Sequence, residues 1–363
     1  MYKYAFLFLL FILPIVVIPV GFSYFEAPKV ILTEIVVEFL LFQAIVSKSI
    51  RKILQIPKQY LPLFLGFFIL TIMDLLFLRT PTTFFGNPFR LQGVFLVWHL
   101  LVLSLFSSTI SLKELPKPTY TISLFGVLVG ALLFGTNGDN RIIGTLGEPN
   151  ALAASVVFLW PFAWYNAAND KYFLKWLFPI LAFVIIFLTG SRSGLLAYFI
   201  EAFFIFFAQR SQNIKKGSII CMLFIACSML FPFIENKGPF ENRGEVWKTA
   251  FLSGLEAPLV GHGFGNVEKA LKETSMRIGN NIRFQYVDSS HNILLDYWTE
   301  GGILGLGLLL IFLFLSFREY IQHHEKSLLA PLLGICTVML FNPVSVVTLV
   351  AFWFLIGQGV RRR

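Results

Sequence analysis

The chain alternates between long apolar stretches and short polar segments along most of its length. A helix that crosses a bilayer needs about 20 mostly apolar residues, and these runs lack the strict alternation of a barrel strand. We therefore predict an all-α, polytopic integral membrane protein, with about 12 transmembrane helices in a single domain over residues 1–363. The expected helices span approximately residues 4–21, 30–47, 61–78, 94–110, 119–135, 150–167, 174–189, 193–208, 218–234, 291–317, 327–342 and 344–360. The last two are so close together that a re-entrant hairpin is an alternative for them.

The longest polar interruption is a loop of 56 residues, 235–290, between the ninth and tenth predicted helices. It holds seven acidic and seven basic residues, so it carries no net charge. Its segment 243–251 has the spacing of an amphipathic helix lying on a membrane, and the glycines of 261–265 predict a tight turn. The loop ends at His291, where the next apolar segment begins. We interpret it as an extracytoplasmic loop lying over the active site.

Composition agrees with the membrane class, because only 13% of the residues are charged, against about 25% in soluble proteins. The three cysteines all lie inside apolar runs, so we expect them to be packing residues rather than metal ligands. The first apolar run lacks a good cleavage signal and is expected to remain as the first helix. The net charge of +9 does not indicate nucleic-acid binding, because its distribution follows the predicted topology.

Basic residues give that topology. With the amino terminus inside, the inside segments hold 17 lysines and arginines and the short outside segments hold five. Cytoplasmic loops carry such an excess of positive charge. Both termini are therefore predicted to be cytoplasmic, with the long loop outside. The five outside residues are Lys29, Arg79, Arg90, Arg141 and Arg192.

Four of these five outside residues are arginine, whose planar guanidinium binds phosphate oxygens in two places. They suggest an anionic headgroup or a phosphorylated substrate, and the alternative is headgroup anchoring of single helices. Acidic residues within predicted helices are costly there, and we expect them to pair with arginines or with each other. This group comprises Glu34, Glu38, Asp74 and Glu201. His99 is expected to be a packed, neutral residue.

Several motifs occur in a fixed order in residues 140–310. They are Gly144-Thr-Leu-Gly-Glu-Pro-Asn150, Leu188-Thr-Gly-Ser-Arg-Ser-Gly-Leu-Leu-Ala197, Arg243 with Trp247, Pro258 with Gly261-x-Gly-x-Gly265, His291-Asn-Ile-Leu-Leu295, and Glu300-Gly-Gly-Ile-Leu-Gly305. Together with the topology and the late outside loop, they resemble the O-antigen ligase and polymerase superfamily. The preceding helices resemble it in topology and in the loop 86–90.

The resemblance implies a bacterial inner-membrane glycosyltransferase for lipopolysaccharide or other polysaccharides, with its active site facing outward. Such enzymes transfer a glycan from undecaprenyl pyrophosphate to an acceptor hydroxyl, with neither a metal nor a nucleotide cofactor. Arg192 and Arg243 match the family positions that bind the donor pyrophosphate, and Arg90 and Arg141 are further candidates. His291 matches the family histidine and is expected to act as the catalytic base of an inverting displacement.

Two alternatives remain open from the sequence. Within the same superfamily, the acceptor hydroxyl could belong to a lipid-linked core sugar, to another carrier-bound glycan or to a protein. These acceptors correspond to a ligase, a repeat-unit polymerase and a protein O-oligosaccharyltransferase. Outside the enzyme class, twelve helices are compatible with a polysaccharide transporter or flippase. The chain shows no internal repeat of the kind that many transporters contain, which favours the enzyme.

Overall fold

The computed structural model describes residues 2–19, 23–48, 56–110, 118–136, 140–167, 172–207, 213–228, 243–280 and 287–360. Every element of secondary structure named in these ranges is helical, and the β-pairing is an isolated bridge between Thr136 and Ile142. The α-helices are α1 (Tyr2–Leu7), α2 (Ala27–Val46), α4 (Leu61–Leu78), α5 (Pro81–Phe85), α6 (Val94–Ser107), α7 (Pro118–Phe134), α8 (Pro149–Ala167), α9 (Tyr172–Thr189), α10 (Arg192–Phe207), α11 (Ile214–Ser228), α13 (Arg243–Glu256), α14 (Val267–Ile278), α15 (Ile293–Gln322), α16 (Lys326–Met339) and α17 (Val346–Val360). The first helix continues into short π and 3-10 turns, η1 (Phe8–Ile12) and η2 (Leu13–Ile15), and η4 (Gly144–Leu146) precedes α8.

Each predicted apolar helix corresponds to a helix of the structure, with differences at the ends. The first one is shorter than expected: it ends at Ile15, whereas the prediction extended it to residue 21. Pro14 lies in its last turn, and the next residue, Val16, has an extended backbone. The ninth is predicted over 218–234 and observed as α11, Ile214–Ser228, and residues 229–234 lie outside the described ranges.

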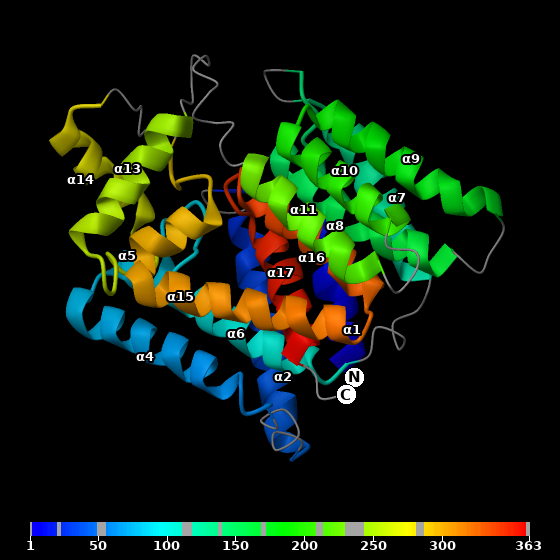
Figure 1. Cartoon of the computed structure of the whole chain (residues 1–363). Coiled ribbons are helices and arrows are strands. Elements are labelled where there is room, and N and C mark those ends of the chain that lie inside the picture. The colour runs from blue at the N-terminus through cyan, green and yellow to red at the C-terminus, as the bar shows by residue number, and fades with distance from the viewer. Residues whose placement is uncertain are drawn as a thin grey trace.

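The long loop also contains helices. The amphipathic segment predicted at 243–251 is α13, which continues one turn further to Glu256, and α14 follows it without having been predicted. Figure 1 shows α13 and α14 together at one end of the molecule, next to the beginning of α15, and α13 packs on both α14 and α15.

Helix α17 lies at the centre of the bundle. All its residues from Val346 to Val360 are buried, which is typical of a helix that is apolar on every side. It packs on α6, α15, α16 and α8 (Figure 1). A Cβ atom on Gly357 would lie 2.1 Å from the carbonyl oxygen of Ser104, so glycine allows α17 and α6 to approach closely. This helix therefore fixes the positions of the helices around it.

The hairpin of α16 and α17 extends between the two predicted membrane faces. At its turn, the Asn342 side chain donates to Ser193 Oγ, next to the predicted outer arginine Arg192. At the far end of α17, Gln358 Nε2 donates to the carbonyl oxygens of Ser107 and Ile110, at 2.6 and 3.0 Å, near the predicted inner end of α6. This arrangement favours two crossing segments over a re-entrant hairpin.

Helix α15 is broken at Gly302, where φ is +57° and ψ is −153°. The glycine turn of the long loop fills the break: the Ile303 N–H donates to the Pro258 carbonyl at 2.8 Å, and the Gly263 N–H donates to the Glu300 carbonyl at 2.8 Å. A Cβ on Gly302 would lie 2.6 Å from the backbone carbon of Leu259. The two glycine motifs are thus explained by one close contact between two backbones.

By length and composition, two described helices can cross a membrane, Leu61–Leu78 and Ile293–Gln322. Several other apolar helices are shorter, such as Val94–Ser107, whose 14 residues extend about 21 Å against a hydrocarbon core of about 30 Å. The all-helical class is observed, and the number of spans remains a prediction.

The acidic side chains within the helices have partners other than arginine. Asp74 accepts the Phe264 N–H at 3.1 Å, and Glu201 accepts the indole N–H of Trp160. Glu38 lies 3.5 Å from Nε2 of His99. The expected pairing with an arginine or with another of these carboxylates is therefore not what these three side chains show, because each lies among helices that present an indole, an imidazole or a backbone N–H instead. Burial of His99 agrees with the prediction of a packed residue.

The cysteines are all free thiols, as expected. Cys221 is buried and Cys336 is half-buried, whereas Cys227 is exposed on α11. The expectation of a packing role therefore fits Cys221 and Cys336 better than Cys227.

Candidate active site

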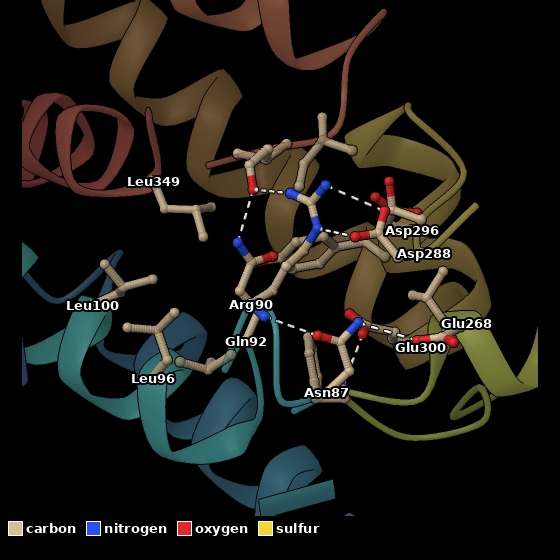
Figure 2. Close-up of a pocket in the computed structure, with 18 residues that line it drawn as sticks. Asn87, Arg90, Gln92, Leu96, Leu100, Glu268, Asp288, Asp296, Glu300 and Leu349 are labelled. Carbon is tan, nitrogen blue, oxygen red and sulfur yellow. Dashed lines mark hydrogen bonds and ion pairs between the residues drawn. The ribbon is translucent and has the colours of Figure 1, made fainter. Parts of the chain in front are cut away.

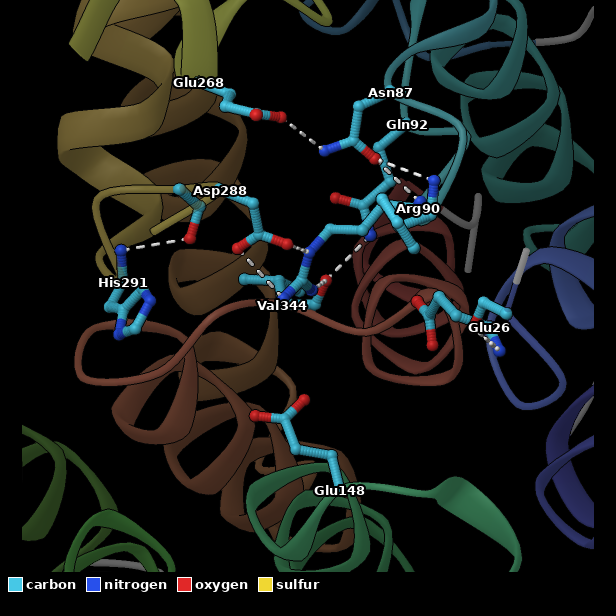
Figure 3. A network of polar contacts seen from close by, with 12 residues as sticks. Glu26, Asn87, Arg90, Gln92, Glu148, Glu268, Asp288, His291 and Val344 are labelled. Atoms are coloured by element: carbon cyan, nitrogen blue, oxygen red, sulfur yellow. Dashed lines mark hydrogen bonds and ion pairs between the residues drawn. The ribbon is translucent and has the colours of Figure 1, made fainter. Parts of the chain in front are cut away.

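The turn Phe341–Ser345, between α16 and α17, is the point where several predicted outer segments meet. Figure 3 shows the polar groups around it. The Val344 carbonyl accepts from Arg90 Nη1 at 3.3 Å and from Gln92 Nε2 at 2.7 Å. The Glu26 carboxylate accepts the N–H of Val346, the first residue of α17. A carboxylate at a helix amino terminus is favourable for both the free N–H groups and the helix dipole.

Arg90 is engaged by an acidic residue of the long loop. Its Nε and Nη2 donate to the two carboxylate oxygens of Asp288, the second contact being 3.2 Å, in the two-pronged geometry of a strong ion pair. The side chains are 17% and 29% exposed. Burial by itself would lower the pKa of Arg90, but the adjacent Asp288 carboxylate raises it above its usual range. Arg90 is therefore cationic and is bound to Asp288 across 198 positions of sequence.

His291 lies three residues after Asp288 and is 6% exposed. Its φ is +58°, a left-handed conformation that is rare for residues other than glycine, asparagine and aspartate. Neighbouring serines hold this conformation: Ser289 Oγ accepts the His291 N–H at 3.1 Å, and the Ser290 N–H donates to Asp296 at 2.7 Å. A strained backbone held by its surroundings is common at functional sites.

The next residue, Asn292, begins α15. Its side-chain oxygen accepts the N–H groups of Leu294 and Leu295, at 3.0 and 3.3 Å, as a helix N-cap does. The imidazole is thus attached to a rigid helix end, which limits the positions that it can occupy.

Two further carboxylates lie within electrostatic reach of Arg90, and one of them, Glu148, is also within reach of His291. Burial raises the pKa of Glu148 above its usual value, and this effect outweighs the opposing, lowering effect of the nearby Arg90 and His291. Burial also raises the pKa of Glu26, to about 7, against the opposing effect of Arg90. Figure 3 shows Glu148 and the Arg90–Asp288 pair on opposite sides of Val344 in the 341–345 turn, with His291 to one side of them.

Arg141 and Arg192 belong to the adjacent turn before α10. Arg141 Nε donates to the Thr189 carbonyl at 2.7 Å, and its Nη2 donates to Asn150 Oδ1 at 3.3 Å. Asn150 in turn donates to Glu148 at 3.5 Å. Arg192 begins α10 directly after this braced turn, and its side chain is exposed. Arg141 therefore supports the segment that presents Arg192.

Arg243 begins α13, one turn before Trp247. The Trp247 ring is 3% exposed and packs on Phe341, with the ring centroids 6.0 Å apart. This contact brings the amino-terminal end of α13 to the same 341–345 turn. Trp247 is thus a packing residue.

A pocket lies beside the Arg90–Asp288 pair (Figure 2). Leu96, Leu100 and Leu349 form one side, and polar groups form the other. The polar lining residues include Asn87, Arg90, Gln92, Glu268, Asp288, Ser289, Asp296, Tyr297 and Glu300. In the described ranges, no group of three or more His, Cys, Asp or Glu side chains is arranged to hold a metal ion.

Three of the five residues predicted from the sequence are connected to the 341–345 turn. Arg90 contacts it directly, Arg192 adjoins Ser193, which accepts from Asn342, and Arg243 lies one turn before Trp247, which packs on Phe341. Arg141 is linked to Glu148 through Asn150, and Glu148 lies within electrostatic reach of His291. The sequence analysis missed Asp288, Glu148 and Glu26. Glu148 was part of a quoted motif but had no assigned role, and Asp288 carries no local signal of its pairing with Arg90.

The described residues thus form an all-helical protein in which two helices are long and apolar enough to cross a membrane, with arginines and a histidine near one inter-helix turn. Residues 177–310 match the family model described as O-antigen ligase. The match confirms, over this region, the resemblance to the O-antigen ligase superfamily, whose members are membrane proteins of ligase or polymerase type. A search of curated proteins found no match.

Proposed function

We propose that this chain is a glycosyltransferase that transfers a glycan from undecaprenyl pyrophosphate to an acceptor hydroxyl. The observation that carries the proposal is that His291, Arg192 and Arg243 all fall in the region 177–310 that matches O-antigen ligase, with Arg192 and Arg243 connected to the 341–345 turn through their neighbours Ser193 and Trp247. The family supports a ligase- or polymerase-type transfer in general. The donor, the inverting course and the residue roles are our inference from the site.

In the proposed reaction, His291 takes the proton of the acceptor hydroxyl. The hydroxyl oxygen attacks the anomeric carbon, the bond from that carbon to the diphosphate oxygen breaks, and the configuration inverts. Carboxylates near His291, such as Glu148, would stabilise the imidazolium that forms, as a triad aspartate does.

The departing diphosphate gains negative charge, so fixed cations nearby lower the barrier. Arg192 is an exposed cation on a rigid helix end and suits this role. Arg243 begins α13 on the other side of the turn and is the second candidate. Arg141 braces the turn before α10 and Arg90 holds Asp288 near His291, so we assign these two arginines supporting roles.

We further propose that the chain spans the bacterial inner membrane about 12 times, with both termini cytoplasmic and the site facing outward. The positive-inside count supports this orientation. The residues 235–290 would then form an outer lid, of which α13 and α14 are the described helices. Cysteine substitutions labelled from one side of sealed vesicles test this topology.

The deciding experiment uses the purified chain in lipid nanodiscs with a carrier-linked glycan and a panel of lipid-linked, carrier-linked and peptide acceptors. We expect transfer to one class of acceptor, resistance to chelators, and loss of transfer in His291→Ala with insertion unchanged. His99→Ala is the matched control, since that buried histidine pairs with Glu38 in α2. Full activity of a stably inserted His291→Ala would remove the base role. Glycan translocation without transfer would instead support a transporter.

A further inference from the structure

The pocket of Figure 2 differs in chemistry from the arginine-bearing side of the site. It lies between the loop that carries Arg90, the beginning of α15 and the beginning of α17. It borders the proposed base, because Ser289 lines it and accepts the backbone N–H of His291.

Each nitrogen-bearing side chain of the pocket wall donates a hydrogen bond to another protein group. Arg90 donates to Asp288 and Val344, and Gln92 Nε2 donates to Val344. Asn87 Nδ2 donates to Glu268 at 3.1 Å. Arg90 is the single cation among the described residues that line the pocket, and its pairing with Asp288 leaves no unbalanced positive charge in this wall for an anionic ligand.

Acceptors dominate the same wall. Four carboxylates line it against a single guanidinium, and they come from separate parts of the chain: Glu268 from α14, Asp288 from the end of the loop, and Asp296 and Glu300 from α15. Asp296 and Glu300 each accept a backbone N–H, from Ser290 and Gly265, at 2.7 and 2.8 Å. A carboxylate has about four acceptor positions, so one such bond leaves further acceptor capacity.

The remaining lining is apolar or aromatic. Leu96, Leu100 and Leu349 form the side opposite the carboxylates, and Phe264 and Tyr297 lie at 81° to each other with centroids 5.6 Å apart. A pyranose ring matches these two sides, because it combines hydroxyl donors with an apolar C–H face. A pyrophosphate does not match, since it offers only acceptors and negative charge.

We propose that this pocket binds the acceptor sugar, and that it selects neutral or amino-bearing pyranosides over uronates. The assignment to the acceptor rests on the proposed glycosyl transfer, whereas the sugar selectivity rests on the pocket alone. A sugar held here would bring a hydroxyl towards His291, while the donor diphosphate remains on the side of Arg192 and Arg243.

The test is saturation-transfer NMR on the full chain in nanodiscs, with methyl glucoside, methyl glucosaminide and methyl glucuronide as probes. We expect saturation of the first two and little of the third. Glu268→Gln removes one pocket charge while keeping an oxygen that accepts from Asn87. We expect it to weaken glucosaminide binding about three- to tenfold and to increase glucuronide binding. Glu273→Gln is the matched control, because Glu273 lies on the same helix and is exposed.

The proposal is overturned if none of the three glycosides is saturated, if the glucuronide binds as well as the glucoside, or if Glu268→Gln behaves like Glu273→Gln. These outcomes are separate from the proposed function, because glycan transfer is measured on its own with the carrier-linked donor. If glycan transfer is retained but no sugar binds in the pocket, the assignment of the pocket is wrong and the proposed glycosyltransferase function is unaffected.

Discussion

The ion pair between Arg90 and Asp288 is expected to position His291 rather than to bind the donor. Arg90 comes from the loop before α6, and Asp288 lies three residues before His291. Each partner has additional contacts: Arg90 donates to Val344, and Asp288 adjoins the serines that hold the left-handed His291. Removal of either charge should therefore loosen the segment that carries the imidazole.

The magnitude follows from burial. Removing one member of a buried ion pair costs about 3–5 kcal/mol, and the 17% and 29% exposure of these side chains places the pair near the lower limit. We expect Asp288→Asn and Arg90→Gln each to lower the free energy of unfolding by about 3 kcal/mol. Because both remove the same interaction, the double variant should cost much less than the sum, with a coupling energy of at least about 1 kcal/mol.

Two measurements on the purified chain test this prediction. Detergent-induced unfolding of the four proteins in the cycle gives the coupling energy, and transfer kinetics separate kcat from KM for the donor. Positioning predicts a lower kcat in Asp288→Asn with donor KM nearly unchanged. If Arg90 instead binds pyrophosphate, Asp288→Asn frees it and lowers the donor KM. The reasoning is refuted if the unfolding free-energy changes of the two single variants add up, within about 0.5 kcal/mol, to that of the double variant, or if Asp288→Asn lowers the donor KM.

Three other predictions concern separate parts of the structure. Burial raises the pKa of Glu26 from 4.5 to about 7, so the folded state holds this proton more tightly than the unfolded state. The stabilisation that comes from protonated Glu26 should be complete below pH 4.5 and be lost as the pH rises through 7. The thermal unfolding temperature of Glu26→Gln should therefore depend less on pH between these values than that of the unmodified chain. Gly302→Ala should lower the free energy of unfolding by about 3 kcal/mol, because φ is +57° and the new Cβ would meet Leu259. Gly307 lies in the same helix with open space around it, so Gly307→Ala should change this free energy by less than about 1 kcal/mol. A detergent unfolding assay measures both. Arg192→Gln should reduce kcat/KM for the carrier-linked donor by about 100-fold without loss of folding, and an unchanged kcat/KM would exclude it from the diphosphate site.

Much of the helical architecture could be predicted from the sequence. Apolar length alone placed each predicted helix close to an observed one, because hydrogen-bonded helices satisfy the backbone within an apolar environment. The candidate site residues His291, Arg192 and Arg243 could also be proposed from the sequence, since their motifs are local. The match to the O-antigen ligase model over residues 177–310 agrees, in that region, with the resemblance that these motifs indicated.

The partners of the polar groups could not be predicted, because they join residues far apart in the chain. Arg90 meets Asp288 across 198 positions, and Asp74 accepts the N–H of Phe264 across 190. Local pattern gave no reason to prefer these partners over the arginines that were expected. The sequence shows which side chains are charged. Which group pairs with each charge depends on which helix ends are brought together when the helices pack.

The sequence by itself thus determined the all-helical class and the order of the helices, and it supplied the candidate site residues. Only the tertiary structure decided that α17 is the buried centre, that the glycine turn fills the break at Gly302, and that the Phe341–Ser345 turn gathers the site. The physical reason is that helix formation depends on neighbouring residues and on apolar content. The site depends instead on close contacts between backbones and on ion pairs, which exist only after distant segments have packed.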